Sequence, residues 1–498
     1  MKRLSHTVIK NALVNTTRLG VGAAVALVLP PTLTRLLDRD QFAAWVLLLQ
    51  IAAYANYFDF GIQTAVARFV AQAMERGDEK ERDGYISTAF FLLVGAGILA
   101  FALLCVMAWL APAIFKQAPL RLIAQLRAGL ILLAAFSALA LPTSAFAGVF
   151  VGLHKNEFPA LASGCSRLLG AALVILAVHR THSLVVMAGL IGGSNLLGGL
   201  FLFLQARRVL PTMLVSFRSI SKRYLASLSK FCGGLTVWSF AMFFIGGLDL
   251  TIVGYFRFSG VAYYSVASTL VMILSGLGGA ATSALITPTA AIHALGDYDR
   301  LGAIVLRTTR HVTQLGVLLT FVFIVFGVRI LTLWVGPVYA QNSRYILDVL
   351  AMATAIRLLG GPYSAALIGT GKHVGVVFSP LFEAGTNLLV SVTACYYIGP
   401  IGVALGTLVG AIAAISLMIW YYMPRISEVR INPAAFLIRA VVRPAIELAP
   451  ALGGLYIGIS GTWLGVLPRL LIAIGGIALT WLIYRPYLQL GAVKAEAV

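Results

Sequence analysis

Charged residues are scarce in this chain. Of its 498 residues only 11% are charged, whereas 60% are hydrophobic. Soluble domains carry about a quarter charged residues, so the composition excludes a soluble protein and indicates a polytopic membrane protein. No hydrophilic stretch is long enough for a separate soluble domain, because the longest polar connection runs only from Arg207 to Lys230.

Enzyme signatures are also missing. The sequence contains no Walker A motif, no G-x-S-x-G motif and no His, Cys or carboxylate cluster with metal-ligand spacing. The four cysteines stand singly in apolar segments, where they are typical of packing residues: Cys105, Cys165, Cys232 and Cys395. We therefore expect no enzyme activity, no metal ion and no cofactor. No short apolar run ending in an A-x-A site follows Met1, so we expect no cleaved signal.

Acidic residues are scarcer than basic ones, 17 against 37, which gives a formal net charge of +20. No basic run is interleaved with a soluble fold, so the excess does not indicate a nucleic-acid partner. An excess of basic residues is typical of membrane proteins whose cytoplasmic loops are basic and contact membrane lipids.

A membrane-spanning helix needs about 20 apolar residues. By this criterion we predict an all-α protein with fourteen spans, at about 12–34, 42–68, 86–111, 124–152, 158–179, 184–206, 231–256, 261–292, 304–334, 345–369, 374–397, 400–423, 435–458 and 464–485.

The basic residues predict the topology. With these spans, 23 of the 37 lie on the side of the N-terminus, nine lie on the other side, and five fall inside spans: Arg18, Arg68, Arg127, Arg167 and Arg357. An even number of spans places both termini on one side, and the excess of positive charge predicts that this side is the cytoplasm.

The chain repeats itself with an offset of 219 residues. Phe42-Ala43-Ala44-Trp45 corresponds to Val261-Ala262-Tyr263-Tyr264, Thr64-Ala65 to Ser283-Ala284, and Gly77-Asp78 to Gly296-Asp297. We predict two six-helix lobes related by a pseudo-two-fold axis along the membrane normal, with a midplane site between them. The expected domains are an N-lobe (1–210), a basic cytoplasmic linker (211–230), a C-lobe (231–425) and two further helices (426–498).

The first two spans carry polar side chains where lipid disfavours them. Asn11, Asn15, Arg18 and Gly22 share one helical face, and Asn56, Asp59 and Gln63 share another. A charge at the centre of a bilayer costs about 2.5–3.5 kcal/mol on insertion scales, so we expect Arg18 and Asp59 to face a protein or water interior. Snorkelling of Arg18 is the alternative. Asp59 either pairs with Arg18 or serves as a proton or cation site.

Further polar residues lie inside later spans. We predict that Arg167 and Arg357 line the cavity with Asn15, Arg18, Asn56 and Gln63. Asp59, Asp249 and Glu383 are candidate residues for coupling transport to a proton or cation. Arg68 lies near the end of a span, where its side chain could snorkel to the membrane interface or line a portal for the substrate.

Several motifs, taken in order, resemble those of a known family. They are the polar start Asn15-Thr16-Thr17-Arg18, then Leu36-Leu37-Asp38-Arg39-Asp40-Gln41-Phe42, then Asp59-Phe60-Gly61-Ile62 with Gly77-Asp78, and finally Gly369-Thr370-Gly371-Lys372. The chain resembles the multidrug/oligosaccharidyl-lipid/polysaccharide exporter superfamily, and within it the Wzx-type flippases of O-antigen or capsule repeat units. Ala43-Ala44 departs from the family's usual turn glycine.

The resemblance implies a V-shaped two-lobe transporter with alternating access in a bacterial inner membrane. It implies a cationic cavity for an undecaprenyl-pyrophosphate-linked oligosaccharide, and polysaccharide polymerase or assembly proteins as partners. Arg18 matches a first-span arginine of the related lipid II flippases, whereas Arg167 and Arg357 match no family position. Two alternatives are a cation-coupled multidrug exporter, which needs an acidic cavity, and a polytopic glycan polymerase or ligase, which needs a catalytic outer loop.

Overall fold

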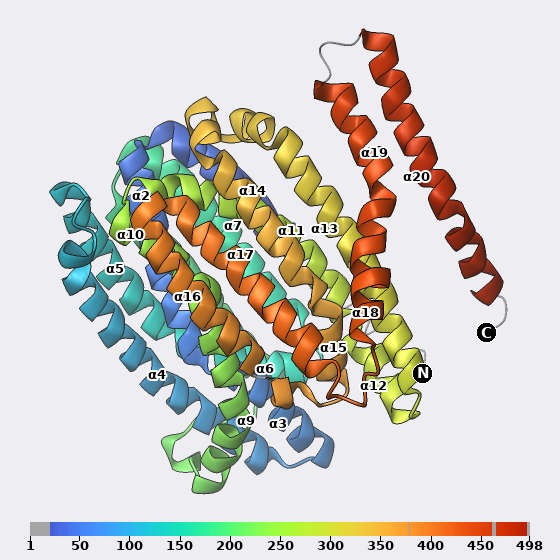
Figure 1. Cartoon of the computed structure of the whole chain (residues 1–498). Coiled ribbons are helices and arrows are strands. Elements are labelled where there is room, and N and C mark those ends of the chain that lie inside the picture. Colours follow the sequence, from blue (N-terminus) through green and yellow to red (C-terminus); the bar gives the residue numbers. More distant parts are fainter. Residues whose placement is uncertain (1–19, 377, 461–464, 496–498) are drawn as a thin grey trace. The chain divides into compact units, whose positions relative to one another are not determined.

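The computed structural model describes residues 20–376, 378–460 and 465–495, and it is helical throughout, with no strand among those residues. Nine of the described helices are long and apolar enough to cross a membrane, as expected for a multi-pass membrane protein (Figure 1). After a helical segment at residues 20–36, the elements are α2 (Arg39–Ala52), η1 (Ala53–Asp59), α3 (Ile62–Arg76), α4 (Glu79–Ile114), α5 (Leu120–Ala140), η2 (Leu141–Thr143), α6 (Ser144–Gly152), α7 (Glu157–Arg180), α8 (Leu184–Val209), η3 (Phe217–Ser219), α9 (Lys222–Met242), η4 (Phe243–Gly247), α10 (Asp249–Phe256), α11 (Gly260–Ser283), α12 (Ile286–Ala294), α13 (Tyr298–Val335), α14 (Pro337–Leu359), α15 (Gly361–Gly369), η5 (His373–Val376), α16 (Phe378–Ile398), α17 (Pro400–Leu417), η6 (Met418–Tyr422), α18 (Pro433–Ala435), η7 (Phe436–Val442), α19 (Arg443–Ser460) and α20 (Val466–Ala495).

Within the described residues, each predicted span overlaps one or more helical elements, but the second span is not one continuous helix. After α2 the chain tightens into the 3-10 helix η1, and Phe60 (φ 51°) and Gly61 (φ 77°) then adopt left-handed backbone angles before α3 begins. Two consecutive left-handed residues end a helix. The prediction that Asn56, Asp59 and Gln63 share one helical face is therefore wrong, because Gln63 belongs to the next helix.

The repeated Gly-Asp pair has the same role in both halves. Gly77 (φ 68°) and Gly296 (φ 72°) are left-handed and end a helix, and the Oδ1 atoms of Asp78 and Asp297 then accept the backbone N–H of Glu81 and Arg300. These acceptors are also 219 residues apart, as are the starts of α4 and α13. The duplication predicted from sequence is therefore present in the local structure.

Close helix contacts repeat as well. In the first half, a methyl group added at Gly152 would lie 2.5 Å from the carbonyl oxygen of Ala67, and one at Gly97 would lie 2.8 Å from that of Ala138. In the second half, a methyl group added at Gly369 would lie 2.7 Å from the carbonyl oxygen of Ile286, and one at Gly316 would lie 3.2 Å from the Cβ atom of Ala355. Small residues let neighbouring membrane helices approach each other, so the same tight contacts hold α6 to α3, α15 to α12, α4 to α5 and α13 to α14.

These contacts predict the effect of enlarging one glycine. Gly152→Leu is expected to destabilise the protein by about 1–3 kcal/mol, because the side chain would overlap the backbone of α3. Thermal unfolding in detergent measures the loss. Gly95→Leu is the control, because a Cβ atom at Gly95 meets nothing within 4 Å. Equal melting temperatures for the two variants would contradict the packing role of Gly152.

The chain divides into two compact units. Unit 1 comprises residues 1–269, 334–339 and 391–403, and unit 2 comprises residues 270–333, 340–390 and 404–498. The first half and α9–α10 thus share unit 1, together with short segments from later helices. The linker boundary at 211–230 stays a prediction.

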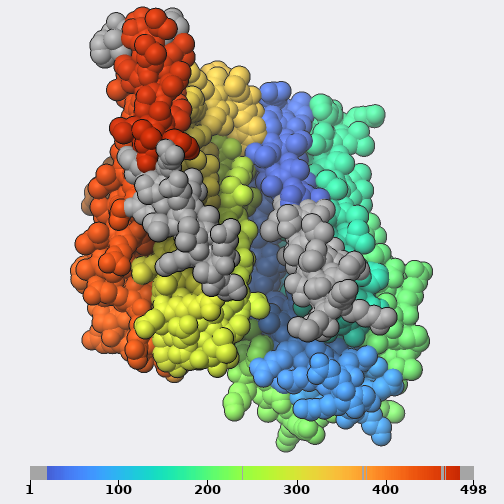
Figure 2. Space-filling view, turned by 90° about the vertical axis from the view of Figure 1, so that its right-hand side faces the viewer, coloured from blue at the N-terminus to red at the C-terminus, as the bar shows by residue number. Residues whose placement is uncertain are grey.

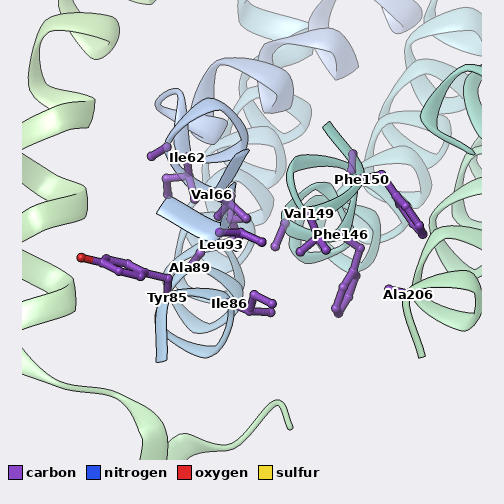
Figure 3. Close-up of a cluster of buried hydrophobic side chains, with 14 of the residues drawn as sticks. Ile62, Val66, Tyr85, Ile86, Ala89, Leu93, Phe146, Val149, Phe150 and Ala206 are labelled. Carbon is purple, nitrogen blue, oxygen red and sulfur yellow. The ribbon is translucent and has the colours of Figure 1, made fainter. Parts of the chain in front are cut away.

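Each unit has its own apolar core. In unit 1, side chains from α3, α4 and α6 pack together, among them Val66, Ile86, Leu93, Phe146 and Phe150 (Figure 3). In unit 2, Leu301, Tyr363, Met418 and Phe436 belong to a second cluster, and α19 and α20 lie side by side (Figure 1).

The Gly-x-Gly-Lys motif, residues 369–372, forms the turn between α15 and η5 in unit 2. Gly371 is left-handed (φ 73°), and the Nζ atom of Lys372 lies 2.7 Å from Oε1 of Glu428, in the connection after η6. Lys372 lowers the pKa of the Glu428 carboxyl. The motif therefore joins two interhelical connections of unit 2.

Candidate functional site

Arg167 lies halfway along the apolar helix α7, and its guanidinium group lies against the first helical segment of unit 1. The contact is at Gly22, where an added methyl group would lie 2.7 Å from Nη1 of Arg167. The absence of a side chain at Gly22 therefore makes room for the guanidinium group. Helical spacing puts Gly22 on the face predicted for Asn15 and Arg18, which themselves lie outside the described residues.

Arg167 forms no ion pair with any described carboxylate, and its side chain is exposed. Arginine stays protonated at all physiological pH values, so this site carries a permanent positive charge within a membrane-spanning helix. Such a group can bind an anion, and its planar fork of N–H donors matches a phosphate group in particular.

Asp59 occupies the break between η1 and α3. Its carboxylate accepts a hydrogen bond from the hydroxyl of Ser144, the first residue of α6, at 3.0 Å. The N-cap of α3 is Gly61, and no side chain caps it, so Asp59 lies just before α3 and is tied to α6. Its predicted pairing with Arg18 falls outside the described residues.

The remaining site residues of the second span do not converge on Asp59. The side chain of Asn56 is exposed and that of Gln63 is half-buried. Arg68 is exposed, and its guanidinium carbon lies 5.1 Å from the ring centroid of Phe231 in α9. This cation–π contact fits a residue near a span end.

The hydrogen bond from Ser144 separates two roles for Asp59. Asp59→Asn keeps a side-chain oxygen as an acceptor and is expected to change the stability little, whereas Asp59→Ala removes the acceptor of the Ser144 hydroxyl and is expected to cost about 1 kcal/mol. Thermal unfolding measures both, and a transport assay made alongside tests coupling. A stable Asp59→Asn variant that does not transport would show that the ionisable group is needed beyond this hydrogen bond.

Asp249 lies where the seventh predicted span changes its helical geometry. The π-helix η4 ends just before Asp249, whose Oδ2 accepts a hydrogen bond from the hydroxyl of Tyr264 at 2.7 Å. Two side chains of the second span also reach this region. Gln50 Nε2 donates to the carbonyl oxygen of Gly247 at 2.7 Å, and the hydroxyls of Tyr54 and Thr251 are 2.5 Å apart. The π turn alters the regular bonding of its carbonyl groups, and Gln50 supplies a donor to one of them.

In unit 2 the structure brings together two residues that the sequence analysis had assigned to different roles. Nε of Arg357 in α14 lies 2.7 Å from Oε1 of Glu383 in α16. The side chain of Glu383 is 9% exposed and that of Arg357 is 37% exposed. Nη2 of Arg357 is buried without a hydrogen-bond partner among the described residues. Arg357 is thus largely neutralised, in contrast to Arg167.

Three partners escaped the sequence analysis: Ser144, Tyr264 and Gln50. Ser144 and Gln50 are ordinary polar residues in apolar helices and give no signal of their own. Tyr264 did appear as a landmark of the repeat, but nothing in the sequence linked it to Asp249.

The model of a family described as "Polysaccharide biosynthesis protein" matches residues 8–291 of the chain. No curated protein sequence matches it.

Solved structures resemble the chain over most of its length. A structure of the lipid II flippase MurJ in an inward closed conformation aligns with a TM-score of 0.72 and 13% identity, covering 96% of this chain and 100% of that one. An inward-facing multidrug resistance MATE family transporter of the MOP superfamily aligns with a TM-score of 0.60 and 17% identity, covering 83% and 98%. A MOP superfamily transporter from Pyrococcus furiosus aligns with a TM-score of 0.58 and 16% identity, covering 86% of this chain and 96% of that one. The fold is therefore that of the MOP superfamily.

Proposed function

Because the chain belongs to the family of polysaccharide biosynthesis proteins, we propose that it is a flippase for undecaprenyl-pyrophosphate-linked oligosaccharide units. The similarity in fold to a lipid II flippase supports a lipid-linked substrate. We place the protein in a bacterial inner membrane with both termini in the cytoplasm, where the excess of basic residues would face.

The observation that carries this proposal is the guanidinium group of Arg167 beside Gly22. A pyrophosphate group bears negative charge that is costly to move through hydrocarbon. An arginine without a described counter-ion, within an apolar helix, offers it charge-assisted hydrogen bonds along the way. A cationic drug would be repelled there, which disfavours the multidrug exporter.

The mechanism follows from the different needs of the two ends of the substrate. The isoprenoid tail can stay in lipid throughout, so only the pyrophosphate and the sugars need a polar path. We assign Asn15, Arg18 and Arg167 to the pyrophosphate, and Asn56 and Gln63 to the sugars. Arg357 is a secondary site, because Glu383 already pairs with it.

Alternating access would expose this path first to one side of the membrane and then to the other. If transport is coupled to protons, Asp59 and Asp249 are the candidate carriers, because both are carboxylates within predicted spans. The carboxylate of Asp59 accepts a hydrogen bond from the Ser144 hydroxyl, and that of Asp249 accepts one from the Tyr264 hydroxyl. Polysaccharide polymerase or assembly proteins would take up the flipped product.

Complementation of a strain that lacks a polysaccharide flippase tests the proposal. Wild type should restore surface polysaccharide, Arg18→Ala should not, and Asp59→Asn should fail only if its proton is used. Accumulation of lipid-linked oligosaccharide on the cytoplasmic side locates the block. Normal export by Arg18→Ala and Asp59→Asn together would overturn the site assignment, and failure of wild type with every such substrate would overturn the function.

A further inference from the structure

The connection between α8 and α9 is held firmly against the start of α4. We call residues 210–223 the strap. The backbone N–H of Leu214 donates to Oδ2 of Asp83 at 3.1 Å, the hydroxyl of Ser87 donates to the Leu214 carbonyl at 3.2 Å, and the N–H of Ser216 donates to Oγ of Ser87 at 3.1 Å. In Figure 2 the green surface of this region adjoins the blue surface around the start of α4.

A buried arginine reinforces the attachment. Arg82 is 2% exposed, its Nε lies 2.8 Å from Oδ1 of Asp83, and its Nη2 donates to Oγ1 of Thr212 in the strap at 3.2 Å. Tyr224, just after the strap, packs on Gly84, where an added methyl group would overlap the Tyr224 ring. Asp83 is thus engaged by Arg82 and by the strap's backbone, so it does not neutralise the strap's outward-facing charges.

The strap presents apolar side chains outward. Leu214 is 63% exposed and Phe217 is 72% exposed. The Phe217 ring meets that of Phe91 edge to face, with centroids 5.3 Å apart. Phe91 belongs to the predicted span 86–111, so Phe217 lies at the depth at which α4 is already apolar. An exposed aromatic ring at that depth is typical of the membrane interface.

Basic side chains surround this apolar anchor. Arg218 and Lys222 are exposed and form no ion pair among the described residues. Arg223 is 75% exposed and approaches Glu81 only at 3.7 Å. Cations beside an interfacial aromatic ring attract the anionic headgroups of phospholipids.

From this arrangement we propose that the strap is a binding site for anionic phospholipid, with Arg218 and Lys222 contacting the headgroup phosphate and Phe217 inserted among the acyl chains. The site is separate from the proposed transport path, and it does not depend on the identity of the transported substrate.

Unit 2 also carries exposed aromatic and basic side chains together, at a position that does not correspond to the strap. In η6, at the end of the twelfth predicted span, Trp420 and Tyr421 are 65% and 47% exposed, and the guanidinium carbon of Arg425 lies 3.9 Å from the Tyr421 ring centroid. Aromatic and basic residues at the end of a span are typical of the membrane interface.

Native mass spectrometry of the full-length protein tests the site. The detergent-purified protein is titrated with phosphatidylglycerol and, separately, with phosphatidylcholine of the same acyl chains. Wild type should bind phosphatidylglycerol more tightly. Arg218→Gln/Lys222→Gln should weaken that binding roughly 25-fold, because each basic residue near an anionic surface contributes about fivefold. Phe217→Ser should weaken the binding of both lipids.

A control variant makes the result decisive. Lys116→Gln/Arg121→Gln removes two exposed charges near the other end of α4 and should keep the selectivity. Unchanged selectivity in Arg218→Gln/Lys222→Gln, or an equal loss in the control, would overturn the proposal.

Discussion

Replacing Arg167 with glutamine is expected to lower polysaccharide export at least tenfold in a complemented flippase-null strain. A charge-assisted hydrogen bond contributes about 1.5–3 kcal/mol, and a tenfold change in rate corresponds to about 1.4 kcal/mol. Because Arg167 has no described carboxylate partner, its loss leaves no buried acid behind, and the fold should remain stable. Surface polysaccharide and the accumulated lipid-linked precursor are the measurements.

Three further variants separate charge, geometry and position. Arg167→Lys keeps the charge but loses the planar fork, so intermediate export is expected. Gly22→Val leaves Arg167 in place but displaces its guanidinium group, and should impair export as well. Arg180→Gln removes an exposed charge at the end of the same helix and should export normally. Normal export by both Arg167→Gln and Gly22→Val would refute the proposed phosphate contact.

The helical spans were predictable because membrane insertion depends on apolar length, which can be counted along the chain. The break after η1 was not. It depends on left-handed angles at Phe60 and Gly61, and a left-handed phenylalanine has no sequence signature. Its consequence for the site is large, because it ends η1 at Asp59 and places Gln63 in the next helix.

The repeat was predictable for a related reason. The Gly-Asp pairs at 77–78 and 296–297 were visible as a fixed offset, and each is required locally by a left-handed turn followed by a helix cap. Their role in ending one helix and starting the next became clear only from the backbone.

Partners between helices were beyond the reach of the sequence. Arg357 and Glu383 were each singled out as intramembrane charges, but 26 residues and two further helical elements separate them along the chain. A single sequence shows which side chains are energetically costly to place in lipid, but it does not show which of them contact each other in the folded protein. The sequence therefore did not show that Arg357 pairs with Glu383, whereas Arg167 has no carboxylate partner among the described residues.

The Arg357–Glu383 pair gives the second large prediction, on stability. Arg357→Gln is expected to destabilise unit 2 by about 2–4 kcal/mol, because the nearly buried carboxylate of Glu383 then has no cation. The partial exposure of Arg357 places the effect toward the low end of the range for fully buried pairs. Thermal unfolding in one detergent at neutral pH compares the variants.

Arg357→Gln/Glu383→Gln should recover much of this loss, since it removes the unpaired charge together with its cause. The double variant also tests the assignment of function. If it is stable and still exports polysaccharide, the pair serves the architecture of unit 2 and Arg167 carries the phosphate contact without it. If it is stable and inactive, the pair takes part in transport, either through the Arg357 guanidinium group as a phosphate donor or through Glu383 as a coupling residue, and Glu383→Gln alone separates the two. A double variant no more stable than Arg357→Gln would contradict the pairing itself.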